Sequence, residues 1–161
     1  MLEFVYGHDE EISRFIATFA HGQLASDNFG RCKTIGIIDE EGKLVAGMVY
    51  FNYDPRAATI EFGSASTTPR WFNRATYRRI FEYPFMECGC QMLYAKIRAD
   101  NEYLLSQFAR MNFNLTIVPR MYGRSDDGVL CTLTDDQWLD CNIAKRIYRD
   151  VNRRKEMEEA A

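Results

Sequence analysis

The stretch that decides the fold runs from Thr59 to Phe85 and reads TIEFGSASTTPRWFNRATYRRIFEYPF. Its start, Thr59–Phe62, is rich in β-branched and apolar residues, which is typical of a strand. The small residues Gly63–Ser66 and the turn residue Pro69 follow. Beyond the turn, ring-bearing and apolar residues recur at helical spacing at Tyr77, Ile80, Phe81, Pro84 and Cys88. The stretch therefore predicts a strand that passes through a turn into a helix.

The turn between this strand and helix is a candidate phosphate site. The first turn of a helix presents backbone N–H groups without helical partners, together with the positive end of the helix dipole. Arg70 and Arg74 flank the turn and add positive charge. An ordinary crossover with solvated arginines would need the same residues, so the rest of the chain has to decide between the two interpretations.

The composition is that of a soluble globular protein. The chain has 161 residues, 47% hydrophobic and 27% charged, and we expect one domain over residues 1–161, with 135–161 as a C-terminal helical extension. The net charge of −3 gives no general attraction to nucleic acid or to a membrane surface. No apolar run approaches the ~20 residues that span a bilayer, and the start does not resemble a signal peptide. We therefore expect a cytoplasmic protein that does not bind a membrane, with nucleic acid as the least likely partner and an amine carried by RNA left open as a substrate.

The five cysteines are scattered and odd in number. Cys88 and Cys90 form a CxC pair, but no second pair or nearby histidine completes a zinc set. We expect reduced thiols and no metal site.

The remaining pattern predicts an alternation of strands and helices. Apolar and β-branched runs predict strands at 2–6, 34–38, 44–53, 57–67, 91–97, 115–118 and 129–133. Helical spacing predicts helices from 9 to Gly22, from about 73, over 101–112 and from 134 or 135 onward. The polar segment 23–33 either borders a substrate entrance or is a plain connector. A strand–helix–strand connection after a three-strand meander requires a parallel pair, so the fold class is α/β with a mixed, mostly antiparallel sheet.

This order resembles the GNAT superfamily of acetyl-CoA-dependent N-acetyltransferases, and two motifs carry the resemblance. The run Arg70–Ala75 is similar to the family's pyrophosphate loop, Q/R-x-x-G-x-G/A, with Asn73 in place of the central glycine. Because Asn tolerates positive φ better than other residues apart from Gly, we expect the turn to persist. The second motif, N-x-x-A/S-x-x-x-Y-x-x-x-G-F, is matched by Asn101, Phe108, Asn112 and Phe113 at the same intervals. Residues 128–138 also look like the branch that acetylates the N-termini of ribosomal proteins.

The resemblance implies a sheet whose central parallel pair splays apart to admit acetyl-CoA. The thioester and pantetheine arm would use unpaired backbone N–H groups of the fourth strand, and the pyrophosphate would rest on the N–H groups of the following turn. The family's Asn contacts the pantetheine arm, and its Phe closes the core behind it. The cofactor-binding residues implied are Ser64, Ala65, Ser66, Thr67, Thr68, Arg70, Trp71, Phe72, Asn73, Arg74, Ala75, Asn101 and Phe108.

Glu61 is the candidate general base, because some members of the family place a glutamate on this strand that takes the amine proton through water. Strand alternation puts Ile60 and Phe62 on one face and Glu61 on the other, which either lines the cleft or faces solvent. The tyrosine that protonates the thiolate in the family is replaced by Phe108. Tyr103, on the same predicted helix, is the candidate substitute, although a role as a core or surface aromatic explains it equally well.

These residues favour an N-acetyltransferase that transfers acetyl from acetyl-CoA to a primary amine, with a slight preference for a peptide or protein amine. Direct attack in a ternary complex is expected, since no cysteine or serine is paired with a base. The alternative is a GNAT-fold binding or structural module that holds CoA without catalysis. A third interpretation, an unrelated α/β interaction domain, makes the Asn101–Phe113 spacing a coincidence. The basic face of the last helix, from Lys145 to Lys155, is either a solvated exterior or an oligomer contact such as a homodimer interface.

Overall fold

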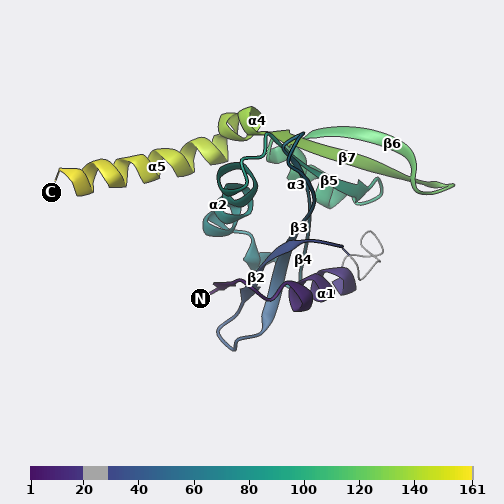
Figure 1. Cartoon of the computed structure of the whole chain (residues 1–161), viewed down its shortest axis with the longest axis horizontal. Coiled ribbons are helices and arrows are strands. Elements are labelled where there is room, and N and C mark those ends of the chain that lie inside the picture. Colours follow the sequence, from purple (N-terminus) through teal and green to yellow (C-terminus); the bar gives the residue numbers. More distant parts are fainter. Residues whose placement is uncertain (20–28, 161) are drawn as a thin grey trace.

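The computed structural model describes residues 1–19 and 29–160, and Figure 1 shows the arrangement of its elements. The helices and strands follow in the order β1 Glu3–Val5, α1 Asp9–Phe19, β2 Lys33–Ile38, β3 Leu44–Asp54, β4 Thr59–Ser66, a 3-10 turn Pro69–Trp71, α2 Arg74–Glu82, a π-helical turn Tyr83–Glu87, β5 Met92–Arg98, α3 Glu102–Arg110, β6 Asn114–Gly123, β7 Asp126–Thr134, α4 Asp135–Asp140 and α5 Asn142–Glu159. The predicted order of elements is confirmed. The segment 23–33, considered above as a substrate entrance, lies mostly outside the described residues.

The strands form one mixed sheet in the order β1-β2-β3-β4-β5-β7-β6. Strands β4 and β5 pair in parallel, and every other neighbouring pair in the sheet is antiparallel. The helix α2 connects the parallel pair, as such a crossover requires. The predicted fold class, a mixed and mostly antiparallel sheet with a splayed central parallel pair and flanking helices, is confirmed.

The two faces of the sheet carry separate cores. On one face α2, α3, α4 and the start of α5 pack against Met48, Tyr50, Leu93 and Leu133 in the larger core. On the other face α1 packs against β3 and forms a smaller core with Val49 and Phe51.

Glycine allows α1 to approach the sheet closely. A Cβ added at Gly47 would lie 2.8 Å from Cγ2 of Ile12, so any larger residue would push the helix outward. Gly36 on the neighbouring strand is equally crowded by Ile12 and Val5. The smaller core therefore depends on two backbone positions that carry no side chain.

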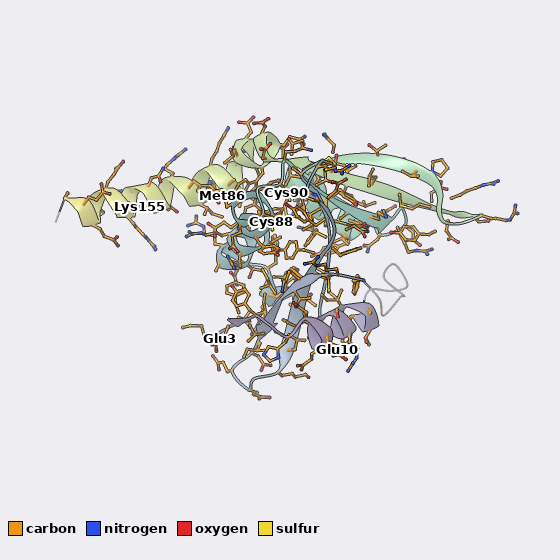
Figure 2. All side chains as sticks on the ribbon, viewed as in Figure 1. Glu3, Glu10, Met86, Cys88, Cys90 and Lys155 are labelled. Carbon is orange, nitrogen blue, oxygen red and sulfur yellow. The ribbon has the colours of Figure 1, made fainter. Side chains whose placement is uncertain are left out.

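The C-terminal part differs from the expectation of one helix beginning at 134 or 135. Cys141 has an extended backbone, with φ −63° and ψ 135°, and it separates α4 from α5. Apolar residues of this segment are buried at Trp138, Cys141, Ala144 and Ile147, and α5 then projects away from the sheet (Figures 1 and 2). At the other end of the molecule, β6 and β7 form a hairpin longer than the two short strands predicted, and it too extends outward (Figure 1). Among the described helices, none combines the length and apolarity needed to cross a membrane.

Candidate functional site

The candidate site lies where β4 and β5 part. Their parallel pairing is limited to three register positions, and the last joins Glu61 to Tyr94. Strand β4 nevertheless continues to Ser66, and it stays paired with β3 on its other side from Glu61 to Ser66. The second half of β4 therefore has one edge without a neighbouring strand, and this edge faces an opening in the centre of the sheet.

Alternate residues of β4 direct their amides toward that opening. The N–H of Thr67 donates to the carbonyl of Val45 at 2.9 Å, on the β3 side. In an antiparallel ladder every second residue bonds to the same neighbour, so the amides of Ala65 and Gly63 also point to β3, and those of Ser64 and Ser66 point into the opening. The resemblance implied Ser64, Ala65, Ser66, Thr67 and Thr68 as the residues of this strand that bind the cofactor; the amide of Thr67 instead bonds to β3, and alternation directs the amide of Ala65 to the same side.

The opening leads into a cavity of about 390 Å³ on the face of the sheet that α2 and α3 cover. Its walls come from β4, from the turn that follows it, and from the inner faces of the two helices. The lining residues are Phe62, Ser64, Ser66, Thr67, Thr68, Pro69, Trp71, Phe72, Ile80, Phe81, Tyr103, Leu104, Gln107, Phe108 and Met111. Seven of the cofactor-binding residues expected from the sequence are in this set, and Ala65, Arg70, Asn73, Arg74, Ala75 and Asn101 are not.

The floor of the cavity is aromatic. Phe108 is 5% exposed, with its ring 4.6 Å from that of Phe113 and 6.2 Å from that of Phe62. Tyr103, expected from the sequence as a substitute acid, lines the same cavity but is 75% exposed. Its phenol is thus at the mouth of the cavity, and the deep position beside Phe62 has no hydroxyl from α3.

Asn73 does not adopt the positive φ expected from the glycine it replaces. Its φ is −133°, and it caps α2, with Oδ1 accepting hydrogen bonds from the N–H groups of Ala75 at 2.9 Å and Thr76 at 3.1 Å. A short polar side chain at this position satisfies the helix start by itself. The expectation of a glycine-like turn was therefore wrong, and the Ala75 amide, expected to bind a phosphate, already has a partner.

The two arginines of the loop lie in different surroundings. The guanidinium of Arg74 forms an ion pair with Asp150 of α5 at 2.9 Å, and both side chains are more than half exposed. Arg70 is exposed and lines a shallow depression with the acidic turn of Asp39, Glu40 and Glu41. Both arginines border the turn as expected, and each has carboxylates beside it.

The two asparagines of the second motif have structural roles. Asn101 caps α3, with Oδ1 accepting from the N–H of Leu104 at 3.2 Å. Asn112 stands where the family has glycine and does adopt a positive φ of 70°, while its Nδ2 donates to the carbonyl of Gln137. The turn after α3 thus keeps the glycine-type conformation, and it places Phe113 in the core behind Phe108.

Glu61 lies on the opposite face of β4 from the cavity. The residue is 4% exposed, which excludes the solvent-facing alternative. Its Oε2 accepts a hydrogen bond from Nδ2 of Asn52 at 2.8 Å, and its Oε1 is 3.4 Å from Nζ of Lys96. A buried carboxylate needs such partners because desolvation disfavours its charge.

Two tyrosines that the sequence did not single out accompany Glu61. Burial and the neighbouring Glu61 carboxylate raise the pKa of Tyr94, and the same two causes raise the pKa of Tyr122 to about 12. The hydroxyl of Tyr122 is buried and has no hydrogen-bond partner among residues 1–19 and 29–160, while the Arg98 guanidinium lies 5.7 Å from its ring centroid. The position of Tyr94 could have been predicted from strand alternation, because Tyr94 and Lys96 are two residues apart on one strand and share a face. Tyr122 follows a backbone irregularity at Arg120, where φ is 60°, and simple alternation could not place it.

The described residues contain no group of three or more His, Cys, Asp or Glu side chains arranged to hold a metal ion. All five cysteines are free, including Cys88 and Cys90, which lie together after the π-helical turn (Figure 2).

Comparison with known proteins places the fold. Mutant forms of the spermidine/spermine N-acetyltransferase SpeG from Vibrio cholerae match with a TM-score of 0.70 at 13% identity, over 88% of this chain and 99% of that chain. A dodecameric spermidine N-acetyltransferase from Vibrio cholerae matches with a TM-score of 0.68 at 12% identity, over 88% and 98%. A proposed acetyltransferase matches with a TM-score of 0.69 at 11% identity, over 92% and 93%. No family model and no curated protein matches the sequence. The chain has the GNAT fold of these N-acetyltransferases.

Proposed function

We propose that this protein is an N-acetyltransferase that transfers acetyl from acetyl-CoA to a primary amine by direct attack in a ternary complex. One observation carries the proposal. Strand β4 continues beyond the point where its pairing with β5 ends, so the amides of Ser64 and Ser66 face an opening that continues into a cavity of about 390 Å³. An extended acyl chain can add to such an edge as an extra strand would. The similar structures from Vibrio cholerae described above are N-acetyltransferases.

The residues of the cavity fit the arm of a CoA thioester. Ser64 and Ser66 offer small side chains and outward amides, while Phe62, Phe108 and Met111 offer apolar surface to the methylene groups of the arm. Acetyl-CoA would supply the activated acyl group, and the amide edge would orient its carbonyl and stabilise negative charge on the oxygen.

Glu61 is the residue proposed to take the proton of the acceptor amine. It lies at the last paired position before the opening, on the face away from the cavity, where an amine that displaces the more exposed Lys96 can reach the carboxylate. The tyrosines near it, Tyr94 and Tyr122, keep neutral phenols at physiological pH because burial and the carboxylate raise the pKa of each. Both can donate or accept a hydrogen bond with the incoming amine.

Two observations favour different classes of amine acceptor, a polyamine and a peptide amine. The similar structures from Vibrio cholerae act on spermidine or spermine, which makes a polyamine the first acceptor to test. The likeness of residues 128–138 to the branch that modifies ribosomal proteins favours a peptide amine. A panel of spermidine, spermine and short peptides with free N-termini, assayed with labelled acetyl-CoA, separates the two.

Cofactor binding is the first experiment, since it precedes any question of acceptor. Isothermal titration should show CoA binding at micromolar affinity or better, and Ser66→Trp, which fills the opening, should abolish it. Ser106→Trp is the matched control, because Ser106 is exposed on α3, its hydroxyl donates to the carbonyl of Tyr103, and it is absent from the cavity lining. Wild-type protein that gives neither heat nor a thermal shift with CoA would refute the proposal.

A binding module without catalysis is the second candidate, and one feature favours it. Phe108 places a ring without a hydroxyl at the deep end of the cavity. CoA thiolate is a good leaving group near neutral pH, so the absence of a phenol need not prevent transfer. CoA binding combined with no transfer to any amine of the panel would select this candidate.

A further inference from the structure

The side chain of Lys96 already holds a primary amine at the candidate base. Its Nζ lies 3.4 Å from Oε1 and 3.5 Å from Oε2 of Glu61. Lys96 belongs to β5 and follows Tyr94, the last β5 residue paired with β4, by two positions. To reach Glu61 its side chain must lean across the line along which the strands separate.

The two partners differ in their access to solvent. The Lys96 side chain is 46% exposed, whereas that of Glu61 is 5% exposed. A lysine side chain has a long flexible stem, so its amine can move by several ångströms without any change of the backbone. Glu61 is fixed by its hydrogen bond from Asn52. The amine is therefore the movable partner of this pair.

The opening in the sheet connects this amine to the proposed thioester position. Ser64 and Ser66 direct their side chains toward the cavity, and their amides lie at the free edge of β4. A thioester held on that edge lies between the two faces of the sheet, with the cavity on one side and the Lys96–Glu61 pair on the other. Lys96 thus occupies the approach that an external amine would take.

We propose that Lys96 is a self-acetylation site, an inference that rests on the proposed acetyltransferase function. In this step the Lys96 ammonium gives one proton to Glu61, directly or through water, and the neutral nitrogen attacks the thioester carbonyl carbon. A C–N bond forms and the C–S bond breaks. The nitrogen loses its second proton, directly or through water, to the departing CoA thiolate, and the products are Nε-acetyl-lysine, CoA thiol and one proton released from Glu61 to solvent.

Acetylation changes the electrostatics of the face on which it occurs. The acetylated side chain is neutral and no longer forms an ion pair with Glu61. The buried carboxylate keeps the hydrogen bond from Asn52 and has no cation beside it. An external ammonium then meets an uncompensated carboxylate and does not have to displace Lys96.

The test uses the purified full chain, acetyl-CoA and peptide mass spectrometry over time. Lys145 is the matched control, because its side chain is 49% exposed and it also pairs with a carboxylate, that of Asp140 at 2.7 Å, away from the opening. Lys155, on the projecting end of α5 (Figure 2), is a second control. We expect acetylation at Lys96 about tenfold faster than at either control, which is a small part of what proximity can supply.

Two variants separate an enzymatic step from chemical acetylation. Glu61→Gln should slow modification of Lys96 about tenfold, to the rate of the controls, because only uncatalysed acetylation remains once the base is removed, and it should leave Lys145 unchanged. Lys96→Arg keeps a cation beside Glu61 and should remove the increment of one acetyl group from the intact mass. A thermal melt shows whether Glu61→Gln is folded, and if it is not, the ratio of Lys96 to Lys145 in the wild type decides.

Equal rates at Lys96 and Lys145 would overturn the proposal, as would a Lys96 rate that Glu61→Gln leaves unaltered. The same preparation is titrated with CoA and assayed with the amine panel. Transfer to an external amine with unmodified Lys96 refutes self-acetylation alone, whereas absence of CoA binding refutes the proposed function as well.

Discussion

Strand β4 has opposite environments on its two faces at the point where it leaves β5. On one face Phe62, Ser64 and Ser66 line a cavity whose remaining walls are mainly apolar. On the other face Glu61 lies between Asn52 and Lys96 in a compact polar cluster. The two environments are separated only by the thickness of the strand, because successive side chains of a strand point to opposite faces.

The difference indicates how the two faces of one strand can serve separate steps of a transfer reaction, binding of the acyl donor on one face and proton removal from the amine on the other. The cavity face can exclude water and hold an acyl chain through apolar contact, and it contributes no charge. The Glu61 face holds a carboxylate whose partners are a cation and an amide, both of which an incoming amine can replace.

Removal of a ring from either face should have a similar cost in stability and a different effect on CoA. Phe108→Ala and Phe51→Ala each delete a buried ring, 5% and 9% exposed, and each should lower the free energy of unfolding by about 3–5 kcal/mol. Only Phe108 lines the cavity, whereas Phe51 packs against Phe29 on the α1 face. Denaturant unfolding measures the first effect and CoA titration the second. Equal loss of CoA affinity in both variants would show that the cavity does not hold the arm.

Loss of the carboxylate should affect catalysis and leave binding intact. Glu61→Gln keeps the size of the side chain and an oxygen for Asn52, but it removes the base. We expect kcat with the external acceptor to fall about 100-fold, roughly 2.7 kcal/mol in activation free energy. CoA affinity measured by titration should stay within about twofold, since Glu61 is not part of the cavity. A parallel loss of CoA affinity would mean that the two faces are not separate.

The sequence predicted the backbone of this site better than its hydrogen bonds. Alternation along residues 59–66 placed Glu61 opposite Phe62, and the strand–helix–strand order required the parallel pair, because both follow from local periodicity. The register between β4 and β3 determines which amides face the opening. No sequence pattern at Val45 indicated that its carbonyl would accept the hydrogen bond of Thr67. The sequence also suggested that Asn73 replaces a glycine through positive φ. In the structure its side chain caps the helix, because an asparagine can satisfy the two amides that a glycine would leave to a ligand.

Residues that are distant in sequence were the least predictable. Lys96 and Asn52 meet Glu61 from neighbouring strands, and Tyr122 arrives from β6 after an irregular segment. Asp150, on the last helix and far along the chain from the motifs, forms an ion pair with Arg74 of the loop. Such contacts are set by sheet order and by the direction of the last helix, and a linear pattern contains neither.

The Arg74–Asp150 pair allows the entrance to the cavity to be tested. Both side chains are more than half exposed, so the pair contributes about 0–1 kcal/mol to stability. If Arg74 also contacts the pyrophosphate, Asp150→Asn should leave the melting temperature nearly unchanged and tighten CoA binding by about two- to threefold. Asp140→Asn is the matched control, since it breaks an exposed pair with Lys145 and should not alter CoA binding. An unchanged CoA affinity in Asp150→Asn would remove Arg74 from the phosphate site.

The smallest effect should come from hydroxyl groups that have no partner. The hydroxyls of Tyr122 and Tyr148 are buried and neither has a hydrogen bond of normal geometry among the described residues, although the Glu82 carboxylate lies near that of Tyr148; burial raises the pKa of each to about 12. Removing either hydroxyl should change stability at neutral pH by less than about 0.5 kcal/mol, because no hydrogen bond is lost.

At high pH, replacement of either tyrosine by phenylalanine should make the folded protein less sensitive to rising pH. Because the pKa is raised in the folded state, the stabilisation is complete below the ordinary value near 10 and is lost as the pH rises toward 12, as the unfolded chain ionises first. Tyr122→Phe and Tyr148→Phe should therefore reduce the loss of melting temperature between pH 9 and 11 to a similar degree. Only Tyr122 lies beside Glu61, so only Tyr122→Phe should raise the KM for the amine, by a few-fold, with the KM for acetyl-CoA unchanged. An equal change of the amine KM in both variants would show that the polar cluster around Glu61 does not bind the acceptor amine.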